Sequence, residues 1–495
     1  MRKRDFLKGT VSVAALAALT TPLFAQRVAK APPPKRMNLL FITADDMDGS
    51  IPGFVSGRTG ITPNLDALAA RSHRFVSNRT VAPICMPSRE AFMSGLLPHR
   101  NGGTGFIPMR EGVPTLTTLL KEQGFFTAAI HKIDHMQPQS SFPWDYIQQG
   151  KDRNALIHAA GAAVVFAEAK AQMRPFFLQC NINDPHRPFY GSPPALRVDH
   201  GNEGPYKVAR EITPAEVVVP PMLDDLPDVR TELAQYWNSI QRLDIAVGGI
   251  LKELERSGEA ENTAIVFCAD HGMPFPFSKA TCYDHGTRQP VLLSWPGMGT
   301  PRAFDSLSTS VDILPTLLEL LGVALPPVLD GRSWMPLIRG EKVAEPEFQF
   351  TYVNQVSSGM AYPMRAIQDR RYSLIFSPWA DGKLNFHIES MIGLTFPAMK
   401  AAAERDSATA ARVKQLVTGV PLAFYDLEQD PGQRHDLLAD PRHKARIERM
   451  KAALLAEMVR TADPELANFR TFLSGGQPNV PQDQARYRLK GDGGE

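Results

Sequence analysis

The chain contains too few cysteines to be a disulfide-stabilised scaffold, since only four occur among 495 residues. Disulfide-rich domains are short and dense in cysteine, so that class is excluded. The sequence also has no Cys-x-x-Cys pair, the spacing typical of thiol redox motifs and many zinc sites. Cys180 and Cys268 lie within apolar runs and are interpreted as core residues.

A strong charge of either sign is also absent. The 54 Lys and Arg residues nearly balance the 52 Asp and Glu residues, which gives a net charge of +2. Residues 1–25 carry four basic side chains and one acidic side chain, so the rest of the chain is close to −1. This balance gives no basis for nucleic-acid binding and confines any basic character to a local site.

Long hydrophobic runs are missing except near the N-terminus. The run from Val11 to Leu23 is shorter than the roughly 20 residues that a spanning helix needs, so no stable membrane insertion is expected. Its basic start and the small residues ending at Ala25 predict that residues 1–25 are a signal peptide and that the protein is exported to the periplasm. The segment from Lys3 to Lys8 resembles a twin-arginine signal whose first Arg is Lys, so the general secretory route remains open as well.

The remaining chain predicts an α/β fold, a large and mainly parallel sheet sandwiched by helices. Apolar strands alternate with helical patterns, which is typical of a sheet covered on both faces. From about residue 345 the pattern changes to a smaller α+β subdomain with an antiparallel sheet. The expected organisation is a signal peptide, a Pro-rich spacer, a catalytic domain, a C-terminal subdomain and a loosely ordered tail, at residues 1–25, 26–36, 37–344, 345–474 and 475–495.

Polar side chains follow four of the predicted strands, at the edge where open α/β sheets bind ligands. Strand 38–43 leads to Asp45-Asp46, strand 126–131 to Lys132 and His135, strand 176–182 to Asp184 and His186, and strand 264–269 to Asp270-His271. One such ending is unremarkable because turns favour Asp, but four predict a converging site. Three carboxylates with one imidazole favour a hard divalent cation, although Asp45-Asp46 alone would equally fit a turn cap.

Cys85 opens the run Cys85-Met86-Pro87-Ser88-Arg89 ahead of an apolar stretch. Pro fits the first turn of a helix, so Cys85 is expected at a helix start, where unpaired N–H groups favour an anion. The pentapeptide by itself is compatible both with a nucleophile and with a small buried cysteine.

Taken in order, these motifs resemble those of the type I sulfatases of the alkaline-phosphatase superfamily. The matching residues are Asp45-Asp46, Cys85-x-Pro87-Ser88-Arg89, Lys132-x-x-His135, Asp184-Pro185-His186, Asp270-His271-Gly272 and Lys279. The resemblance extends from about residue 37 to residue 440. It implies that a formylglycine-generating maturase converts Cys85 to formylglycine, whose hydrate attacks sulfur, forms a covalent sulfated enzyme and then expels sulfate.

The resemblance also implies a role for each remaining residue. Asp45, Asp46, Asp270 and His271 would hold one Ca²⁺, with residue 85 completing the set. Arg89 would steady the hydrate oxygen, Lys132 and Lys279 would neutralise the sulfate, His135 would orient or deprotonate the hydrate, and His186 would protonate the leaving group.

The substrate implied is a small sulfated molecule, expected to be a carbohydrate or glycosaminoglycan fragment, with N- and O-sulfates both open. Asn183 to Pro188 and Tyr362 to Arg365 look like the heparan N-sulfatase (sulfamidase) branch, whereas Lys279 stands where that branch has Arg and is closer to iduronate-2-sulfatase. His131 stands where relatives commonly carry Gly. The alternatives are a phosphonate monoester or phosphodiester hydrolase of the same superfamily and a non-catalytic binder of sulfated glycans. A homo-oligomer is compatible with the sequence.

Overall fold

The computed structural model describes residues 36–150, 153–193, 207–382 and 384–480. The predicted signal peptide, the spacer apart from Arg36, and the tail from residue 481 therefore lie outside the described residues. Among the helices that are described, none is both long and apolar enough to cross a membrane.

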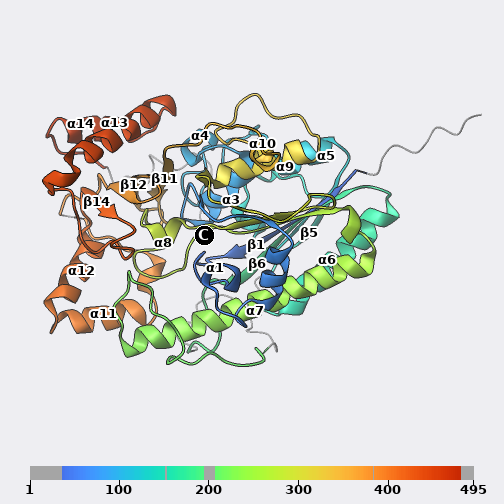
Figure 1. Ribbon diagram of the computed structural model, residues 1–495, viewed down its shortest axis with the longest axis horizontal. Coiled ribbons are helices and arrows are strands. Elements are labelled where there is room, and N and C mark those ends of the chain that lie inside the picture. Colours follow the sequence, from blue (N-terminus) through green and yellow to red (C-terminus); the bar gives the residue numbers. More distant parts are fainter. Residues whose placement is uncertain (1–35, 151–152, 194–206, 383, 481–495) are drawn as a thin grey trace, which may run out of the picture. The chain divides into compact units, whose positions relative to one another are not determined.

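The main sheet has eight strands in the order β5-β4-β6-β1-β7-β8-β2-β9 (Figure 1). β1 lies in the middle and pairs in parallel with β6 on one side and β7 on the other. Parallel pairing continues through β4 and β5, while β8 runs antiparallel to both β7 and β2. The strands are β1 (Asn38–Asp45), β2 (His73–Phe75), β4 (Phe126–Ile130), β5 (Tyr146–Gln148), β6 (Phe176–Pro185), β7 (Thr263–Ala269), β8 (Val291–Ser294) and β9 (Ala303–Phe304).

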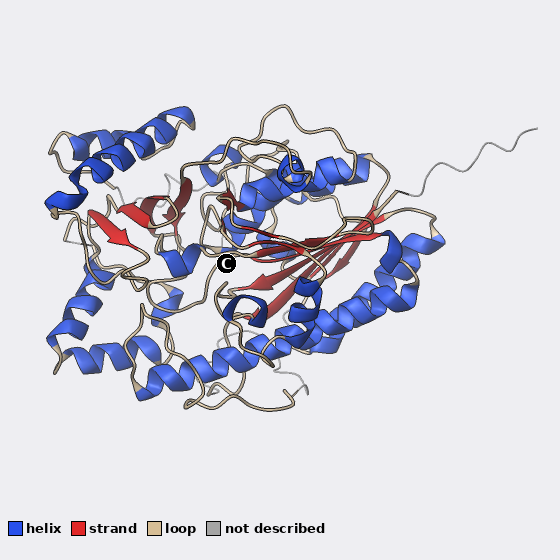
Figure 2. Cartoon of the chain, viewed as in Figure 1, coloured by secondary structure: helices blue, strands red, loops and turns tan. Residues whose placement is uncertain are grey.

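Helices cover both faces of this sheet, as alternation along β1 requires (Figure 2). Leu40 and Ile42 belong to the core formed with α6 (Ala155–Ala171) and α7 (Pro227–Ser257). Leu39 and Phe41 point to the other face and belong to a second core, whose helices are α3 (Cys85–Ser94), α5 (Leu116–Glu122), α9 (Ile313–Leu320) and α10 (Met335–Ile338). Every residue of β1 is buried, which is why the strand reads as a continuous apolar run.

A separate antiparallel sheet follows in the C-terminal part, with strand order β11-β12-β13-β14. Its strands are β11 (Gln349–Gln355), β12 (Ala361–Gln368), β13 (Tyr372–Phe376) and β14 (Leu422–Asp426). Two helices, α13 (Lys444–Arg460) and α14 (Leu466–Leu473), share an apolar core with this sheet. A buried ion pair with an N–O distance of 2.6 Å joins Arg365 on β12 to Asp463 between the two helices.

The predicted fold class is confirmed, because the large, mainly parallel sheet, its two helical layers and the C-terminal antiparallel sheet are all present. The other elements are short or peripheral: α1 (Gly53–Ser56), α2 (Pro63–Ala70), β3 (Asn78–Arg79), α4 (Pro98–Asn101), α8 (Asp284–Thr287), β10 (Ser308–Thr309), α11 (Thr395–Ala403) and α12 (Ser407–Thr418). Two 3-10 turns, η1 (Ile133–His135) and η6 (Glu389–Met391), carry side chains that matter below.

Candidate active site

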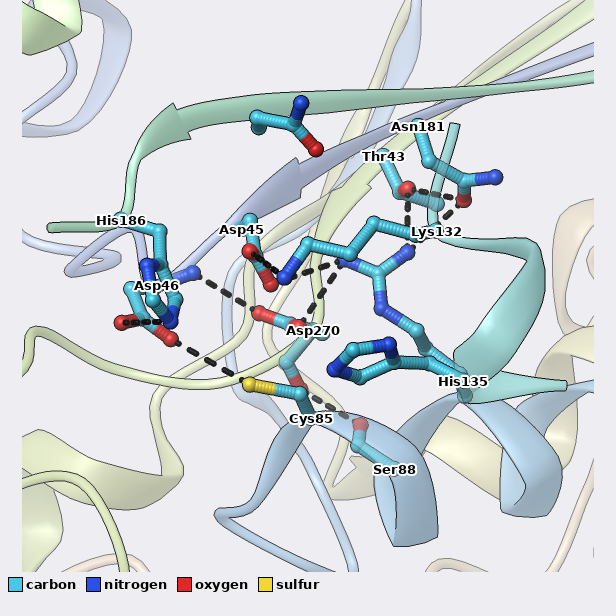
Figure 3. A network of polar contacts seen from close by, with 12 residues as sticks. Thr43, Asp45, Asp46, Cys85, Ser88, Lys132, His135, Asn181, His186 and Asp270 are labelled. Atoms are coloured by element: carbon cyan, nitrogen blue, oxygen red, sulfur yellow. Dashed lines mark hydrogen bonds and ion pairs between the residues drawn. The ribbon is translucent and has the colours of Figure 1, made fainter. Parts of the chain in front are cut away.

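The carboxyl ends of β1, β6 and β7 bring the predicted polar residues together, as Figure 3 shows. Asp45 ends β1 and Asp46 follows it, while Asp270 and His271 directly follow β7. All four side chains are fully buried. The convergence that the four strand endings predict is therefore present in the fold.

Four of these side chains form a compact donor set. The ligand atoms of Asp46, Cys85, Asp270 and His271 all lie within 4.8 Å of one another. Cys85 Sγ is 3.6 Å from Asp46 Oδ1 and 3.3 Å from His271 Nε2. His271 Nδ1 lies 3.0 Å from the carbonyl oxygen of Gly272, so donation to that carbonyl leaves Nε2 available as a ligand.

The donor set fits a hard cation on chemical grounds. Burial raises the pKa of Asp46 well above its usual value; Lys279 opposes this shift, whereas the carboxylates of Asp45, Glu389 and Asp270 add to it. Several buried carboxylates crowd one point, and a divalent cation is the group that offsets such an excess of negative charge. Asp45 groups instead with Cys85 and His186.

Arg89 lies directly behind the acidic cluster and is fully buried. Its Nη2 is 3.1 Å from Asp45 Oδ1 and 3.0 Å from Asp270 Oδ2, so one guanidinium bridges the ends of β1 and β7. Nη1 donates to Thr43 Oγ1 at 2.9 Å and Asn181 Oδ1 at 2.7 Å. These contacts make Arg89 the group that holds the carboxylates in place; its role toward residue 85 remains a prediction.

Cys85 is the first residue of α3, as the sequence predicts, and its side chain is 1% exposed. Ser88, one turn later, donates from Oγ to the carbonyl oxygen of Asp270 at 2.6 Å and so ties the helix start to the end of β7. Burial raises the pKa of the Cys85 thiol well above its usual value, with Lys279 opposing and the nearby carboxylates adding. Burial therefore disfavours the thiolate, which is the nucleophilic form of cysteine.

A cavity of about 380 Å³ opens over this cluster. Five predicted residues line it: Cys85, Lys132, His135, His186 and Lys279. The Nζ of Lys132 lies 2.5 Å from Asp45 Oδ2, and the Nζ of Lys279 lies 2.8 Å from Asp46 Oδ2. Cys85 and the two lysines therefore lie together on the cavity lining, and each ammonium group is paired with a buried carboxylate behind that lining. The two ammonium groups are the positive charges that an anion of sulfate size would meet beside Cys85.

Left-handed backbone accompanies the side chains at the strand ends. Asp46, His131 and Lys132 have φ values of 67°, 59° and 53°, a region that non-glycine residues enter at some cost. A φ of 59° at residue 131 is a conformation that glycine adopts readily. His131 therefore departs from the glycine that the resemblance described above implies for this position. His131 Nδ1 lies 3.1 Å from Asn183 Nδ2, behind the cavity wall.

Sequence reasoning missed Glu389, whose carboxylate lines the same cavity. Its Oε2 is 2.8 Å from Lys279 Nζ, and its Oε1 is 3.6 Å from His186 Nε2. Burial raises its pKa, but Lys279 and His186 outweigh that effect and hold the pKa below its usual range. No local pattern marks this residue, because it lies on a turn after β13, far along the chain from the other site residues. Asn181 was also missed, although its position on β6 faces Arg89.

Comparison with known proteins identifies the family of this chain. A model of the sulfatase family matches residues 37–323, and a model described as the C-terminal part of N-sulphoglucosamine sulphohydrolase matches residues 270–381. The chain is 28% identical to N-sulphoglucosamine sulphohydrolase of Homo sapiens over 466 residues, which cover 86% of this chain and 91% of that protein.

Two solved structures share the fold. One is the structure of a protein in complex with its substrate, D-glucosamine-2-N,6-O-disulfate; it has a TM-score of 0.64 and is 17% identical to this chain. The match covers 87% of this chain and 99% of that one. The second is a phosphonate monoester hydrolase from Silicibacter pomeroyi, with a TM-score of 0.60 and 18% identity. The match covers 88% of this chain and 97% of that one. At such identities the two structures bear on the fold alone. The family model covers more than half of the sequence, so this chain belongs to the sulfatase family and is a sulfuric ester hydrolase.

Proposed function

We propose that the enzyme removes sulfate from sulfated sugars, acting on a sulfate ester or an N-sulfate, through formylglycine formed from Cys85. The observation that carries this proposal is the position of Cys85, which lies at a helix start, between the acidic cluster and two lysines, at the floor of a cavity. The family membership and the likeness to a glucosamine N-sulfatase over most of the chain support the substrate class.

Formylglycine would supply a hydrated aldehyde with two hydroxyl groups. One would attack sulfur, and the other would then expel sulfate and restore the aldehyde, so water would not have to attack sulfur. The residues around it have separable tasks. Lys132 and Lys279 direct their ammonium groups to the cavity floor, where negative charge on sulfate is stabilised. Arg89 holds Asp45 and Asp270 in a fixed arrangement. His135 lies on η1 at the cavity wall, in position to orient the hydrate or accept its proton.

A panel of N-, 2-O- and 6-O-sulfated saccharides tests the proposal by direct measurement of released sulfate. Turnover of at least one member supports it. A phosphonate or phosphodiester hydrolase is the second candidate, because a hydrolase of that class shares the fold. A sulfate ester and a phosphodiester with one common leaving group separate the two, and much faster turnover of the phosphodiester would show that sulfated sugars are not the preferred substrates.

His186 is expected to protonate the leaving group. Its Nδ1 lies 2.6 Å from the carbonyl oxygen of Arg187, so Nε2 is the nitrogen that faces Asp46 and Glu389. We predict that His186→Ala slows substrates with poor leaving groups by about 10²–10⁴-fold and those with good leaving groups far less. The measurement is the dependence of kcat/KM on leaving-group pKa in a series of aryl sulfates. An equal loss across the series would show that His186 has another role.

We propose that Asp46, Asp270 and His271, together with residue 85, hold one Ca²⁺, which would supply Lewis-acid polarisation beside the cavity. Asp45, the fourth predicted ligand, would join this set by exchanging one of its contacts, to Arg89 at 3.1 Å or to Lys132 at 2.5 Å, for the cation. Asp46→Asn tests the calcium site without an activity assay. Calorimetric melting of the unsubstituted protein should show a stabilisation of about 2.7 kcal/mol when Ca²⁺ is present at 100 times its Kd, relative to a chelator. The Asp46→Asn variant should lose this difference.

The matched control for the calcium experiment is Asp48→Asn. Asp48 is equally buried on the same turn but pairs with His285 at 3.0 Å and lies outside the donor set. This variant should melt lower than the unsubstituted protein yet keep the Ca²⁺-dependent shift. If Asp46→Asn keeps the shift as well, the proposed ligand set is wrong.

A further inference from the structure

Glu389 places a negative charge in a cavity whose floor is suited to an anion. Its carboxylate contacts Lys279 at 2.8 Å, and its side chain is 25% exposed, so a molecule in the cavity can reach it. The roles proposed above for cation binding, sulfate stabilisation and proton transfer make no use of this residue. A carboxylate next to the sulfate position repels anions, so its presence requires an explanation in terms of what else the cavity binds.

The segment that carries Glu389 is firmly anchored. Within η6, Ser390 and Met391 are buried, and the backbone N–H of Ile392 donates to the carbonyl oxygen of Glu389 at 2.8 Å. The backbone N–H of Thr395 donates to Glu232 Oε2 at 2.8 Å. Glu232 lies on α7 and also pairs with Arg187, the residue after His186, so the segment is tied to the wall of the cavity. The carboxylate of Glu389 is therefore presented at a defined place.

The other charged groups around the cavity reinforce this pattern. Asp134 lines the cavity as well, with its side chain 53% exposed, and pairs with His135 at 3.1 Å. Arg153 and Arg187 line the cavity too, but their guanidinium groups donate to backbone carbonyl oxygens and pair with Asp184 and Glu232. The cavity's positive charges that are not held by backbone carbonyls are thus the two lysines beside Cys85. The carboxylate of Glu389 lies 3.6 Å from His186 Nε2, the proposed acid for the leaving group.

We propose that Glu389 is a specificity-determining residue, which favours leaving groups that are neutral or cationic beside the scissile sulfate and disfavours those with a second anion there. The inference rests on the proposed sulfatase function and concerns the part of the substrate next to the reacting group. A hydroxyl or ammonium group at that position can donate a hydrogen bond to the carboxylate, whereas a second sulfate or a carboxylate is repelled.

Three aryl sulfates test this inference: 4-nitrophenyl sulfate and its ring-substituted analogues carrying a carboxylate or an aminomethyl group. Each substrate is compared with itself across variants, so differences in intrinsic reactivity cancel. The variants are Glu389→Gln, which removes the charge at nearly constant shape, and Glu389→Asp, which keeps the charge. We expect Glu389→Gln to raise kcat/KM for the carboxylate analogue about tenfold relative to the neutral substrate, a change typical of one nearby charge at a partly solvated site.

For the aminomethyl analogue, Glu389→Gln should lower kcat/KM relative to the neutral substrate, and both changes in kcat/KM should become smaller as salt is added. Glu389→Asp should rank the three substrates by kcat/KM in the same order as the unsubstituted enzyme does. If the ratio of kcat/KM for the carboxylate analogue to that for the neutral substrate is the same in the unsubstituted enzyme and in Glu389→Gln, the inference is overturned. It is also overturned if Glu389→Asp changes this ratio as much as Glu389→Gln does, because the effect would then come from side-chain shape and not from charge. Absence of sulfate release by the unsubstituted enzyme from these three substrates and from every member of the saccharide panel would instead refute the proposed function, so the two failures are distinguishable.

Discussion

Replacing Cys85 by alanine should reduce turnover by at least about 10⁴-fold while leaving the fold intact. The alanine variant keeps the Cβ atom, the helix start and the surrounding ion pairs, and loses only the sulfur, which lies 3.3 Å from His271 Nε2 and 3.6 Å from Asp46 Oδ1. It cannot be converted to an aldehyde, and it has no group that attacks sulfur. Sulfate release measures the loss, and circular dichroism together with the melting temperature monitors the fold.

Cys282→Ala is the matched control for this experiment. Cys282 is fully buried as well, but its sulfur contacts the backbone carbonyl of Thr351 rather than the acidic cluster. Its loss should lower stability slightly and leave turnover unchanged. Mass measurement of peptides adds a direct readout, because conversion of a cysteine to formylglycine lowers the mass by about 18 Da, expected at Cys85 and at no other cysteine. Turnover by Cys85→Ala close to that of the unsubstituted protein would refute the mechanism.

Replacing Arg89 by methionine should destabilise the fold by about 3–5 kcal/mol in the presence of a chelator, because two buried carboxylates lose their shared partner. Arg89 bridges Asp45 and Asp270, and all three side chains are fully buried. Methionine has a similar length but no charge, so Asp270 loses its arginine partner and Asp45 keeps only Lys132. The measurement is the free energy of unfolding from denaturant titration, and sulfate release should be lost as well.

Arg365→Met separates general destabilisation from damage to the site. Arg365 and Asp463 form an equally buried ion pair with an N–O distance of 2.6 Å, but within the C-terminal sheet and its helices. This variant should be destabilised to a similar extent, yet its folded fraction should release sulfate at the normal rate. A melting temperature of Arg89→Met equal to that of the unsubstituted protein would contradict the bridging role.

The main elements of the fold can be predicted from the sequence where a segment shows one clear pattern, such as a continuous apolar run or a long helical periodicity. β1 is apolar on both faces, and burial of both faces requires helices above and below, so the strand and its surroundings are predictable together. α7 (Pro227–Ser257) has Pro227 in its first turn and Gly258 directly after its last residue, two signals that mark the ends of a helix in the sequence. The short strands β2, β5 and β9 were not predicted, because two or three residues carry too little periodicity to distinguish a strand from a loop.

The site was predictable to the extent that it lies on strand ends. Asp45, Lys132 and Asp270 converge because strands of a parallel sheet end at one edge, and this rule needs no tertiary information. Glu389 could not be found in this way, since it reaches the cavity from a turn in the C-terminal part through contacts far apart in sequence. The bridging position of Arg89 was equally inaccessible, because it depends on the distance between two strands rather than on any local motif.

Under the proposed mechanism, the burial of residue 85 limits the time during which Cys85 can be converted to formylglycine. Since Cys85 is 1% exposed and lies at the start of a helix packed against the sheet, a modifying enzyme can handle its backbone and side chain only before α3 has docked. In that mechanism, modification of Cys85 and folding of the chain are competing processes. A chain that folds first would keep an unmodified Cys85 and be inactive, so the active fraction of a preparation would report how many chains were modified before they folded.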